Sequence, residues 1–371
     1  MKLSIERGAL LRSLTHVQNV VERRNTIPIL ANVLIRAEGD SVMLTATDMD
    51  MDIVERIPGR VITPGATTAS AHLLHDIVRK VPDGSEIELD GGGDKEKLTL
   101  RAGRSTFTLR ALPVQDFPML PDDALPHGFA LPAALLSALI DRTRFAISTE
   151  ETRYYLNGIY LHAAMSGVQQ VLRAVATDGH RLARFETPIP EGAENIPGVI
   201  LPRKTVNELR KLLDEHGGDV SIELSETRVR CRLDELTLSS KLIDGTFPDY
   251  ERVIPASNDK IMIVRRKDFT DAVDRVATIS SEKSRAVKLA VADNVLTLSA
   301  TSPDAASATD EQEVEYNSTA IEIGFNARYL MDITGQIEGD AEFAMADSAS
   351  PTVVRDKGDD KVLYVLMPMR V

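Results

Sequence analysis

Apolar residues recur at spacings of three and four in six segments of the chain, as the buried face of a helix requires. These segments cover residues 6–21, 70–81, 132–147, 202–215, 266–279 and 326–337. Between them, short runs alternate apolar and polar residues, which predicts strands because successive side chains of a strand point to opposite faces. The pattern therefore predicts an α+β fold in which helices pack on antiparallel sheets.

The predicted elements recur three times in the same order, which indicates an internal repeat. A strand, a tight turn and a second strand are expected in 33–53, 159–185 and 287–308, with equivalent threonines at Thr47, Thr177 and Thr301. One predicted helix precedes this unit in each third and another follows it. We therefore expect three similar domains, at 1–125, 126–254 and 255–371.

The composition is that of a globular protein, with 43 % apolar residues and no apolar run long enough to span a membrane. The N-terminal "MKLSIERGALL" lacks the basic and then apolar layout of a signal peptide. Cys231 is the single cysteine, and the alternating "RVRCRLDEL" around it predicts a buried core thiol. These features predict a cytoplasmic protein without a membrane partner.

The charge is unevenly distributed along the chain. The net charge is −13, yet the helix-like segments, counted over 6–24, 70–80, 132–147, 203–214, 265–280 and 326–336, carry +7 and the other residues −20. A basic helical layer on an acidic body is typical of a surface that faces phosphates.

The stretch "VATDGHRLARF" (175–185) looks at first like an active site, because Asp178, His180 and Arg181 fall within four residues. Such a group could bind a metal, a phosphate or a carboxylate. Asp178 has a counterpart in Asp48 of the first repeat but a serine, Ser302, in the third. This degeneracy favours a repeated scaffold position over a catalytic one.

Other signals of chemistry are weak. In "TATDMDMDI" an EF-hand beginning at Asp48 would need glycine and glutamate where the chain has Ile53 and Gly59. "DGGGDK" (90–95) lacks the Gly-Lys-Ser/Thr ending of a phosphate loop, and no GxSxG or HExxH motif occurs. We expect no catalytic residue, no metal and no cofactor. The alternative is a metal-dependent hydrolase that uses Asp48, Asp50, Asp178 and His180.

The motifs "NTIPILANVLI", "RYYLNG", "ATDGHRLA", "DGTFPDYERVIP" and "YVLMPMRV" closely resemble the bacterial sliding clamp family, the beta subunit of DNA polymerase III, in register from Met1 to Val371. The resemblance implies three tandem DNA-clamp domains and a head-to-tail homodimer closed into a ring around duplex DNA, without sequence preference. It also implies a processivity factor that tethers the replicative polymerase, the clamp loader and other proteins through short clamp-binding peptides. A purely protein-binding scaffold is the second alternative.

By resemblance, the family's partner-peptide pocket lies between the second and third domains. The matching positions are Leu156, Thr177, Gly179, His180, Arg181, Leu182, Pro248, Arg252, Val253, Val365, Leu366, Met367, Pro368, Met369 and Arg370. Methionine-rich walls suit a site that accepts many ligands.

The resemblance also implies DNA contacts and a dimer interface. The DNA-contact positions are Arg24, Arg153, Tyr154 and Tyr155. The interface is expected to join Arg104, Phe107 and Leu109 to Thr278 and Ile279, with acidic residues of "TSPDAASATDEQ" nearby. The chain departs from the family's pattern at His72, Glu150, Ala349 and Pro351.

Overall fold

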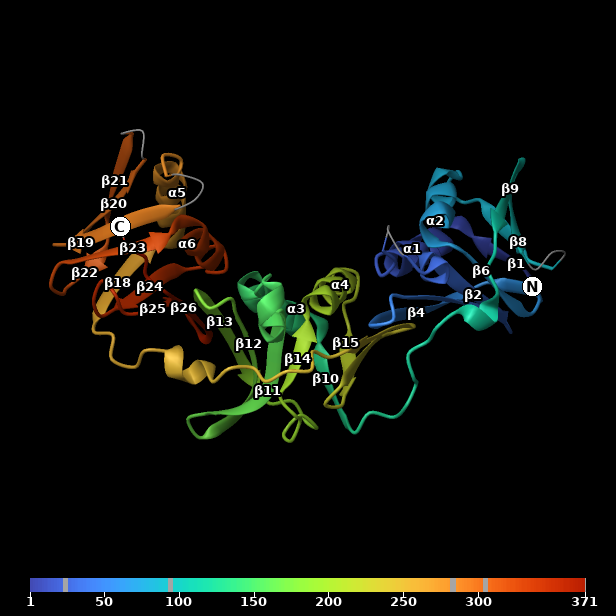
Figure 1. Ribbon diagram of the computed structural model, residues 1–371, viewed down its shortest axis with the longest axis horizontal. Helices are drawn as coiled ribbons and strands as arrows, with labels where there is room; N and C mark the ends of the chain where they lie inside the picture. The colour runs from blue at the N-terminus through green and yellow to red at the C-terminus, as the bar shows by residue number, and fades with distance from the viewer. Residues whose placement is uncertain (23–25, 93–95, 281–284, 303–305, 371) are drawn as a thin grey trace. The chain divides into compact units, whose positions relative to one another are not determined.

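The computed structural model describes residues 1–22, 26–92, 96–280, 285–302 and 306–370 (Figure 1). Its contacts divide the chain into two compact units. The first consists of Met1–Leu135, Pro190–Ile196 and Asn207–Leu242, and the second of Leu136–Ile189, Pro197–Val206 and Ile243–Val371.

The first unit contains two antiparallel sheets. The five-stranded sheet has the order β5-β1-β7-β8-β9, with strands Arg60–Thr63, Lys2–Glu6, Glu86–Asp90, Lys97–Ala102 and Ser105–Arg110. The eight-stranded sheet has the order β10-β15-β16-β17-β4-β3-β2-β6, with strands His127–Pro132, Asp219–Leu224, Arg228–Leu233, Leu236–Lys241, Met51–Pro58, Ser41–Thr47, Asn32–Glu38 and Gly65–Ser70.

Two helices of the first unit, α1 (Arg7–Gln18) and α2 (Ala71–Lys80), contact each other, and α1 also contacts β3 and β4 (Figure 1). Helix α1 begins where the Glu6 carboxylate accepts the backbone N–H of Ala9, at 2.8 Å. Its buried residues include Leu10, Leu14 and Val17, the three-and-four spacing that predicts the helix.

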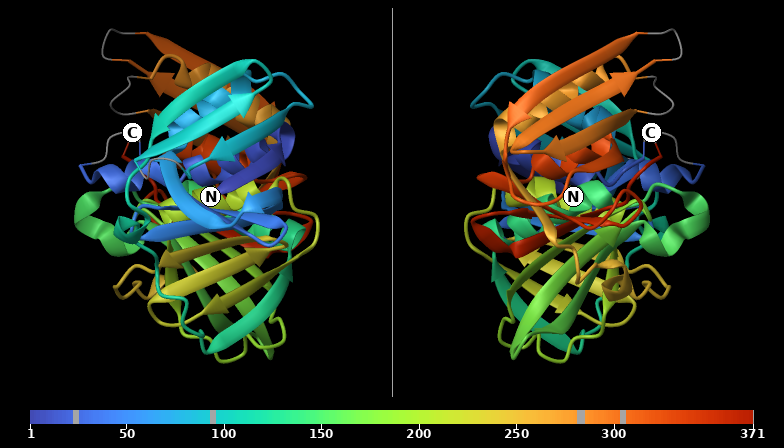
Figure 2. Two further views of the ribbon diagram at one scale, coloured as in Figure 1. Left: turned by 90° about the vertical axis from the view of Figure 1, so that its right-hand side faces the viewer. Right: turned by 90° about the vertical axis from the view of Figure 1, so that its left-hand side faces the viewer.

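The second unit is built in the same way. A nine-stranded sheet has the order β14-β11-β12-β13-β26-β25-β24-β18-β22, with strands Val199–Pro202, Gly158–Ser166, Gln169–Thr177, Arg181–Pro188, Asp359–Leu366, Thr352–Asp356, Asp340–Met345, Lys260–Arg265 and Glu315–Tyr316. A four-stranded sheet has the order β21-β20-β19-β23, with strands Ser307–Glu313, Val295–Thr301, Ala286–Ala292 and Ile321–Asn326, seen largely in orange in Figure 2. Helices α5 (Arg266–Ala277) and α6 (Ala327–Thr334) contact each other.

Helices α3 (Ala133–Thr143) and α4 (Arg203–Leu213) each contain residues of both units. Short 3-10 turns cover Pro28–Ala31 (η1), Val114–Asp116 (η2), Arg144–Ala146 (η3), Glu151–Leu156 (η4) and Tyr250–Val253 (η5). All six helices predicted from the apolar spacing form, each shorter than its predicted segment. The α+β fold with helices on antiparallel sheets is confirmed.

The large sheets run across the predicted domain boundaries. Strand β17 of the second third pairs with β4 of the first, and β13 of the second third pairs with β26 of the third. Each compact unit therefore combines strands of two predicted domains. The boundaries near 125 and 255 fall in strand-free segments, between β9 and β10 and between β17 and β18.

Candidate functional site

The turn between β12 and β13 contains the residues that the sequence singles out. The Asp178 carboxylate accepts the backbone N–H groups of His180 (2.9 Å) and Arg181 (3.0 Å). The Thr177 hydroxyl donates to the Arg181 carbonyl (2.7 Å) and accepts the N–H of Gly179 (3.1 Å). Gly179 has a φ of 87°, in the left-handed region that glycine adopts without strain. Both polar side chains are thus used by their own turn, as in a structural loop.

The equivalent turn of the first repeat has the same hydrogen bonds. The Asp48 carboxylate accepts the N–H groups of Asp50 (2.9 Å) and Met51 (2.7 Å), and the Thr47 hydroxyl donates to the Met51 carbonyl (3.0 Å). Met49 stands where the second repeat has glycine, with a φ of 78°. The prediction of a repeated scaffold position is confirmed.

Arg181 is 8 % exposed and is held by protein groups. Its guanidinium donates to Asp178 (3.1 Å), to Asp332 of α6 (2.5 Å) and to the Phe145 carbonyl (2.6 Å). It also lies 4.4 Å from the centre of the Tyr329 ring. Each of its three nitrogens therefore has an acceptor within the fold, so Arg181 joins the turn to α6 rather than presenting a free cation.

The turn leads into a strand pair that joins the second and third repeats. In the pairing of β13 with β26, Arg181 lies opposite Leu366 and Leu182 opposite Val365. The chain after β26 stays attached, because the Met367 N–H donates to the His180 carbonyl at 2.9 Å. Further on, the Met369 N–H donates to the Gly324 carbonyl at 2.7 Å.

Beneath this strand pair lies an apolar cluster with side chains from both repeats and from the segment that links them. The apolar cluster consists of Leu156, Val175, Leu182, Ile200, Phe247, Tyr250, Val353, Leu363 and Val365, with Tyr155, Tyr160, Ile243, Ile254 and Ala344 packed against it. Two apolar side chains that the resemblance also assigns to the pocket remain open to solvent, Val253 at 47 % and Met367 at 37 %. Together they offer an apolar surface for a ligand.

The remaining predicted pocket residues differ in exposure, and Leu366 is fully buried. Pro248, Arg252 and Arg370 are exposed, and Pro368 and Met369 are half-buried. A cavity of about 820 Å³ is lined by Ala286, Lys288, Ser299, Ala300, Thr301, Glu322, Ile323, Gly324, Ser348, Ala349, Met369 and Arg370. The structure thus brings the end of the chain and Ala349, one of the departures, to one groove.

The predicted DNA-contact residues Arg153, Tyr154 and Tyr155 lie together on η4. Tyr154 is 53 % exposed, whereas Tyr155 is half-buried against the apolar cluster. The Arg153 guanidinium donates to the Glu150 carboxylate at 2.8 Å, and this bond lowers the pKa of Glu150 and raises that of Arg153. Arg24 lies outside the described residues.

His72, another departure from the family's pattern, is half-buried and connects the helices of the first unit. One of its ring nitrogens lies 3.1 Å from the Val21 carbonyl, shortly after the end of α1. The other lies 3.4 Å from the side chain of Gln18, the last residue of α1. The imidazole is therefore used within the fold.

The predicted interface residues of the first repeat lie on β9, which ends the five-stranded sheet. Arg104, in the turn before β9, is exposed, and Phe107 is half-buried. Leu109 is only 4 % exposed and belongs to the core of the first unit. Phe107 is therefore the apolar side chain of β9 that is available to another chain.

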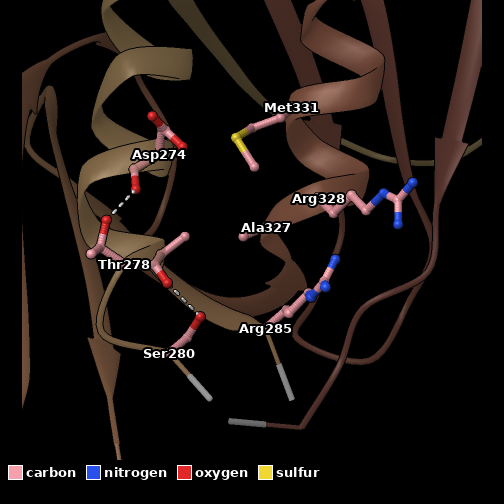
Figure 3. Close-up of a pocket in the computed structure, with 8 residues that line it drawn as sticks. Asp274, Thr278, Ser280, Arg285, Ala327, Arg328 and Met331 are labelled. Atoms are coloured by element: carbon pink, nitrogen blue, oxygen red, sulfur yellow. Dashed lines mark hydrogen bonds between the residues drawn. The ribbon is translucent and has the colours of Figure 1, made fainter. Parts of the chain in front are cut away.

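Thr278 and Ile279 follow the end of α5, and Thr278 lines a cavity of about 490 Å³ (Figure 3). Thr278 is exposed, and its hydroxyl donates to the Asp274 carbonyl at 3.1 Å. Arg285 and Arg328 lie along the same side of this cavity (Figure 3).

The single cysteine, Cys231, lies buried in the core. Burial raises the pKa of the Cys231 thiol to about 12, so it stays protonated and unreactive. Within the described ranges, no three His, Cys, Asp or Glu side chains are grouped so that they could hold a metal ion. In the same ranges, no helix combines the length and apolar character needed to cross a bilayer.

Comparison with known proteins identifies the family. The models for the N-terminal, central and C-terminal domains of the DNA polymerase III beta subunit match residues 1–121, 130–249 and 251–370. The beta sliding clamps of Caulobacter vibrioides NA1000 and Escherichia coli K12 are 55 % and 36 % identical over 372 and 375 residues, and each match covers all of both chains. The crystal structure of a sliding clamp from Bartonella birtlesii bound to griselimycin has a TM-score of 0.97 at 50 % identity, again over all of both chains. The chain therefore belongs to the DNA polymerase III beta subunit family, the beta sliding clamps.

Proposed function

We propose that the chain works as a processivity factor by forming, with a second copy, a head-to-tail ring that encircles duplex DNA. Each chain contributes three clamp domains, 1–125, 126–254 and 255–371. The observation that carries the proposal is the full-length match to sliding clamps together with the three-fold repeat of helix pairs on antiparallel sheets. The protein is non-catalytic, needs no cofactor or metal, and acts on DNA in the cytoplasm.

Two sheet ends support the dimer. Strand β9 ends the five-stranded sheet and carries the exposed Arg104 and Arg110 at its two ends, whereas β21 ends the four-stranded sheet and carries the exposed Glu311 and Glu313. The edge of a strand offers unpaired backbone groups to another chain. Opposite charges on the two edges favour β9 of one copy beside β21 of the next.

DNA is held through phosphates and without base readout, since a sliding ring cannot depend on sequence. Arg24, Arg153, Tyr154 and Tyr155 are the proposed contacts. A closed ring is retained by topology, so the individual contacts can stay weak.

Partners bind at the strand pair of β13 and β26. Their apolar anchors lie over Leu182 and Val365, beside the exposed Val253 and Met367. Burying two anchors contributes about 3 to 6 kcal/mol before ordering costs, which suits exchange among a replicative polymerase, a clamp loader and other proteins with clamp-binding peptides. Arg181 holds the turn, while His180 and the neighbouring backbone orient the peptide.

The ring is tested by its topology. The protein, loaded by its clamp loader onto a nicked circular duplex, is expected to stay bound through gel filtration. Linearising the same circle is expected to release it, because a ring slides off an open end. Equal retention on both forms would indicate a scaffold that binds DNA or a DNA-bound protein without encircling the duplex.

The hydrolase alternative is less favoured, because the Asp48 and Asp178 carboxylates each accept two backbone N–H groups of their own turn. Titration with Mg²⁺, Mn²⁺ or Zn²⁺ in a calorimeter is expected to show no stoichiometric heat. A one-to-one site abolished by Asp178→Asn would favour the hydrolase.

A further inference from the structure

The segment between β17 and β18 forms one wall of the proposed pocket and is attached at two aromatic residues. Tyr250 begins η5, the turn that carries Arg252 and Val253, and is 6 % exposed. Its ring belongs to the apolar cluster together with Phe247, and the two ring centres lie 6.3 Å apart. Pro248 lies between these two residues in the sequence, so the position of the wall depends on how their rings are held.

The Tyr250 hydroxyl lies between two side chains of the second repeat. It accepts a hydrogen bond from Arg173 of β12 at 2.7 Å, and Nε2 of His162 of β11 lies 3.0 Å away. His162 Nδ1 is 3.0 Å from the Ala163 carbonyl, which can only accept, so the neutral ring carries its proton on Nδ1. Nε2 is then an acceptor, and the tyrosine hydroxyl donates to it.

Arg173 is held firmly enough to act as an anchor. It is 3 % exposed and makes two contacts with the Glu186 carboxylate of β13, at 2.8 and 2.7 Å. It also pairs with Glu251, the residue after Tyr250. A buried guanidinium with a paired carboxylate has a fixed geometry, so both of its contacts to η5 start from a rigid strand.

A stack of rings attaches the same segment on its other side. His162 stacks on Tyr160 with ring centres 4.5 Å apart, and Tyr160 stacks on Phe247 at 4.9 Å. The imidazole is therefore connected to this segment in two ways. Its Nε2 contacts the Tyr250 hydroxyl directly, and its ring reaches Phe247 indirectly through the stacked Tyr160.

We propose that Tyr250 is a positioning residue for partner binding, and that Arg173 and neutral His162 hold its hydroxyl so that Val253 and Arg252 face the partner. The proposal rests on the peptide pocket proposed above. Arg173 is buried and His162 is half-buried, and neither is one of the predicted pocket residues, so both are proposed to act through the wall.

Protonation of His162 is expected to release this contact. The charged groups that act on the imidazole are Arg173 of β12, Glu251 of η5 and Glu186 of β13, and Arg184 of β13 pairs with Glu186, with Arg355 near Arg184. Burial lowers the pKa of His162, so the ring is neutral at and above neutral pH. On protonation, Nε2 becomes a donor facing the tyrosine hydroxyl and a second cation beside Arg173, and the hydroxyl loses its acceptor.

The test uses the full-length protein and a fluorescent peptide with a Gln-x-x-Leu-Phe motif. Tyr250→Phe keeps the ring and removes the hydroxyl, and is expected to weaken peptide binding about three- to tenfold, since the wall must then be ordered on binding. Tyr316→Phe is the matched control, because that hydroxyl donates to the Thr319 carbonyl at 2.6 Å in the third repeat. It is expected to bind as the unaltered protein does.

The pH profile separates positioning from general stability. Affinity of the unaltered protein is expected to fall as the pH is lowered below the ordinary range of imidazole. His162→Gln keeps an acceptor that cannot be protonated there but removes the ring from the stack, so it is expected to bind somewhat more weakly at pH 8 and to lose less of that affinity at low pH. The exposed His180 also lies at this site, so the difference between the two profiles is the measured quantity.

Two results would overturn the proposal: Tyr250→Phe binding as tightly as the unaltered protein, or identical pH profiles with and without His162. Met367→Asp shows which idea has failed. If Met367→Asp abolishes binding while Tyr250→Phe does not change it, only the positioning role is wrong. If both variants bind normally, the pocket itself is misplaced.

Discussion

At the scale of single residues, one repeat position explains why the proposed pocket occurs once in the chain. Leu182 lies five residues after Thr177 and pairs with Val365, whereas the equivalent Asp52 lies five residues after Thr47 and pairs with Ser239. The pair is therefore apolar where β13 meets β26 and polar where β4 meets β17. Asp52 is 4 % exposed, and burial raises its pKa to about 6, while hydrogen bonds from Ser239 and Leu120 lower it.

The raised pKa of Asp52 predicts a pH-dependent stability. Its folded pKa lies above the ordinary 3.8, so stability is fully present below pH 3.8 and is lost as the pH rises through about 6. The difference corresponds to at most about 3 kcal/mol at pH 8. Asp52→Asn is therefore expected to unfold at a higher urea concentration than the unaltered protein at pH 8.

At pH 4.5, the urea midpoint of Asp52→Asn is expected to exceed that of the unaltered protein by a much smaller margin. Asp50→Asn is the matched control, because the Asp50 side chain is 80 % exposed and pairs with Lys241 at the surface. A gain for Asp52→Asn of equal size at both pH values would contradict a buried, titrating carboxylate.

At the scale of secondary-structure elements, the sequence pattern predicts the helices and turns, which depend on residues close together in the chain. The apolar spacing predicts all six helices, and the tight turn expected within 287–308 lies at Asp293 and Asn294, where β19 and β20 meet; these residues have positive φ, at 50° and 63°. The pairing of β17 with β4 and of β13 with β26 was not predictable, because periodicity says which face of a strand is buried but not which strand lies beside it.

Only part of the candidate site was predicted, because contacts between segments far apart in the chain do not follow from the local sequence pattern. The resemblance supplied the exposed Val253 and Met367, but Arg173, His162 and Tyr250, which hold the segment with Val253, were missed. Arg173 stands within the apolar run "VLRAVAT". An arginine in a strand that is otherwise apolar indicates a buried charge, and a buried charge requires a paired partner. That its partners are Glu186 and the linker residue Tyr250 follows only from the fold.

The dimer prediction belongs to strand β9. Phe107 is half-buried at the edge of its sheet, so a charge there is expected to block association without opening the core. Phe107→Asp should therefore give the mass of one chain in light scattering, with unchanged thermal unfolding of the domains. Thr108→Asp, on the opposite face of the same strand, is the control and should remain dimeric. A dimeric Phe107→Asp variant would place the interface elsewhere.

At the scale of the whole molecule, the distribution of charge matters more than its sum. The chain carries −13, yet its helical segments are basic. Among the described residues that we propose as DNA contacts, Arg153 is already paired with Glu150. The guanidinium also lies close to the turn of Gly179, since a Cβ added to that glycine would be 2.5 Å from an Arg153 nitrogen. Phosphate must therefore compete with Glu150 for this arginine.

This competition leads to a prediction for duplex binding. A short linear duplex is expected to bind weakly, and the logarithm of affinity to fall with that of salt by about 0.9 for each phosphate contact. Glu150→Gln frees Arg153 and is expected to tighten binding and to steepen the salt dependence by about one contact. Glu151→Gln, on the same turn, removes the same charge without touching Arg153, so it is expected to tighten binding less and to leave the slope unchanged.

Fluorescence anisotropy with two unrelated duplexes of equal length measures both effects. A preference for one duplex would require base readout, and equal slopes for the two variants would show that Arg153 does not contact phosphate.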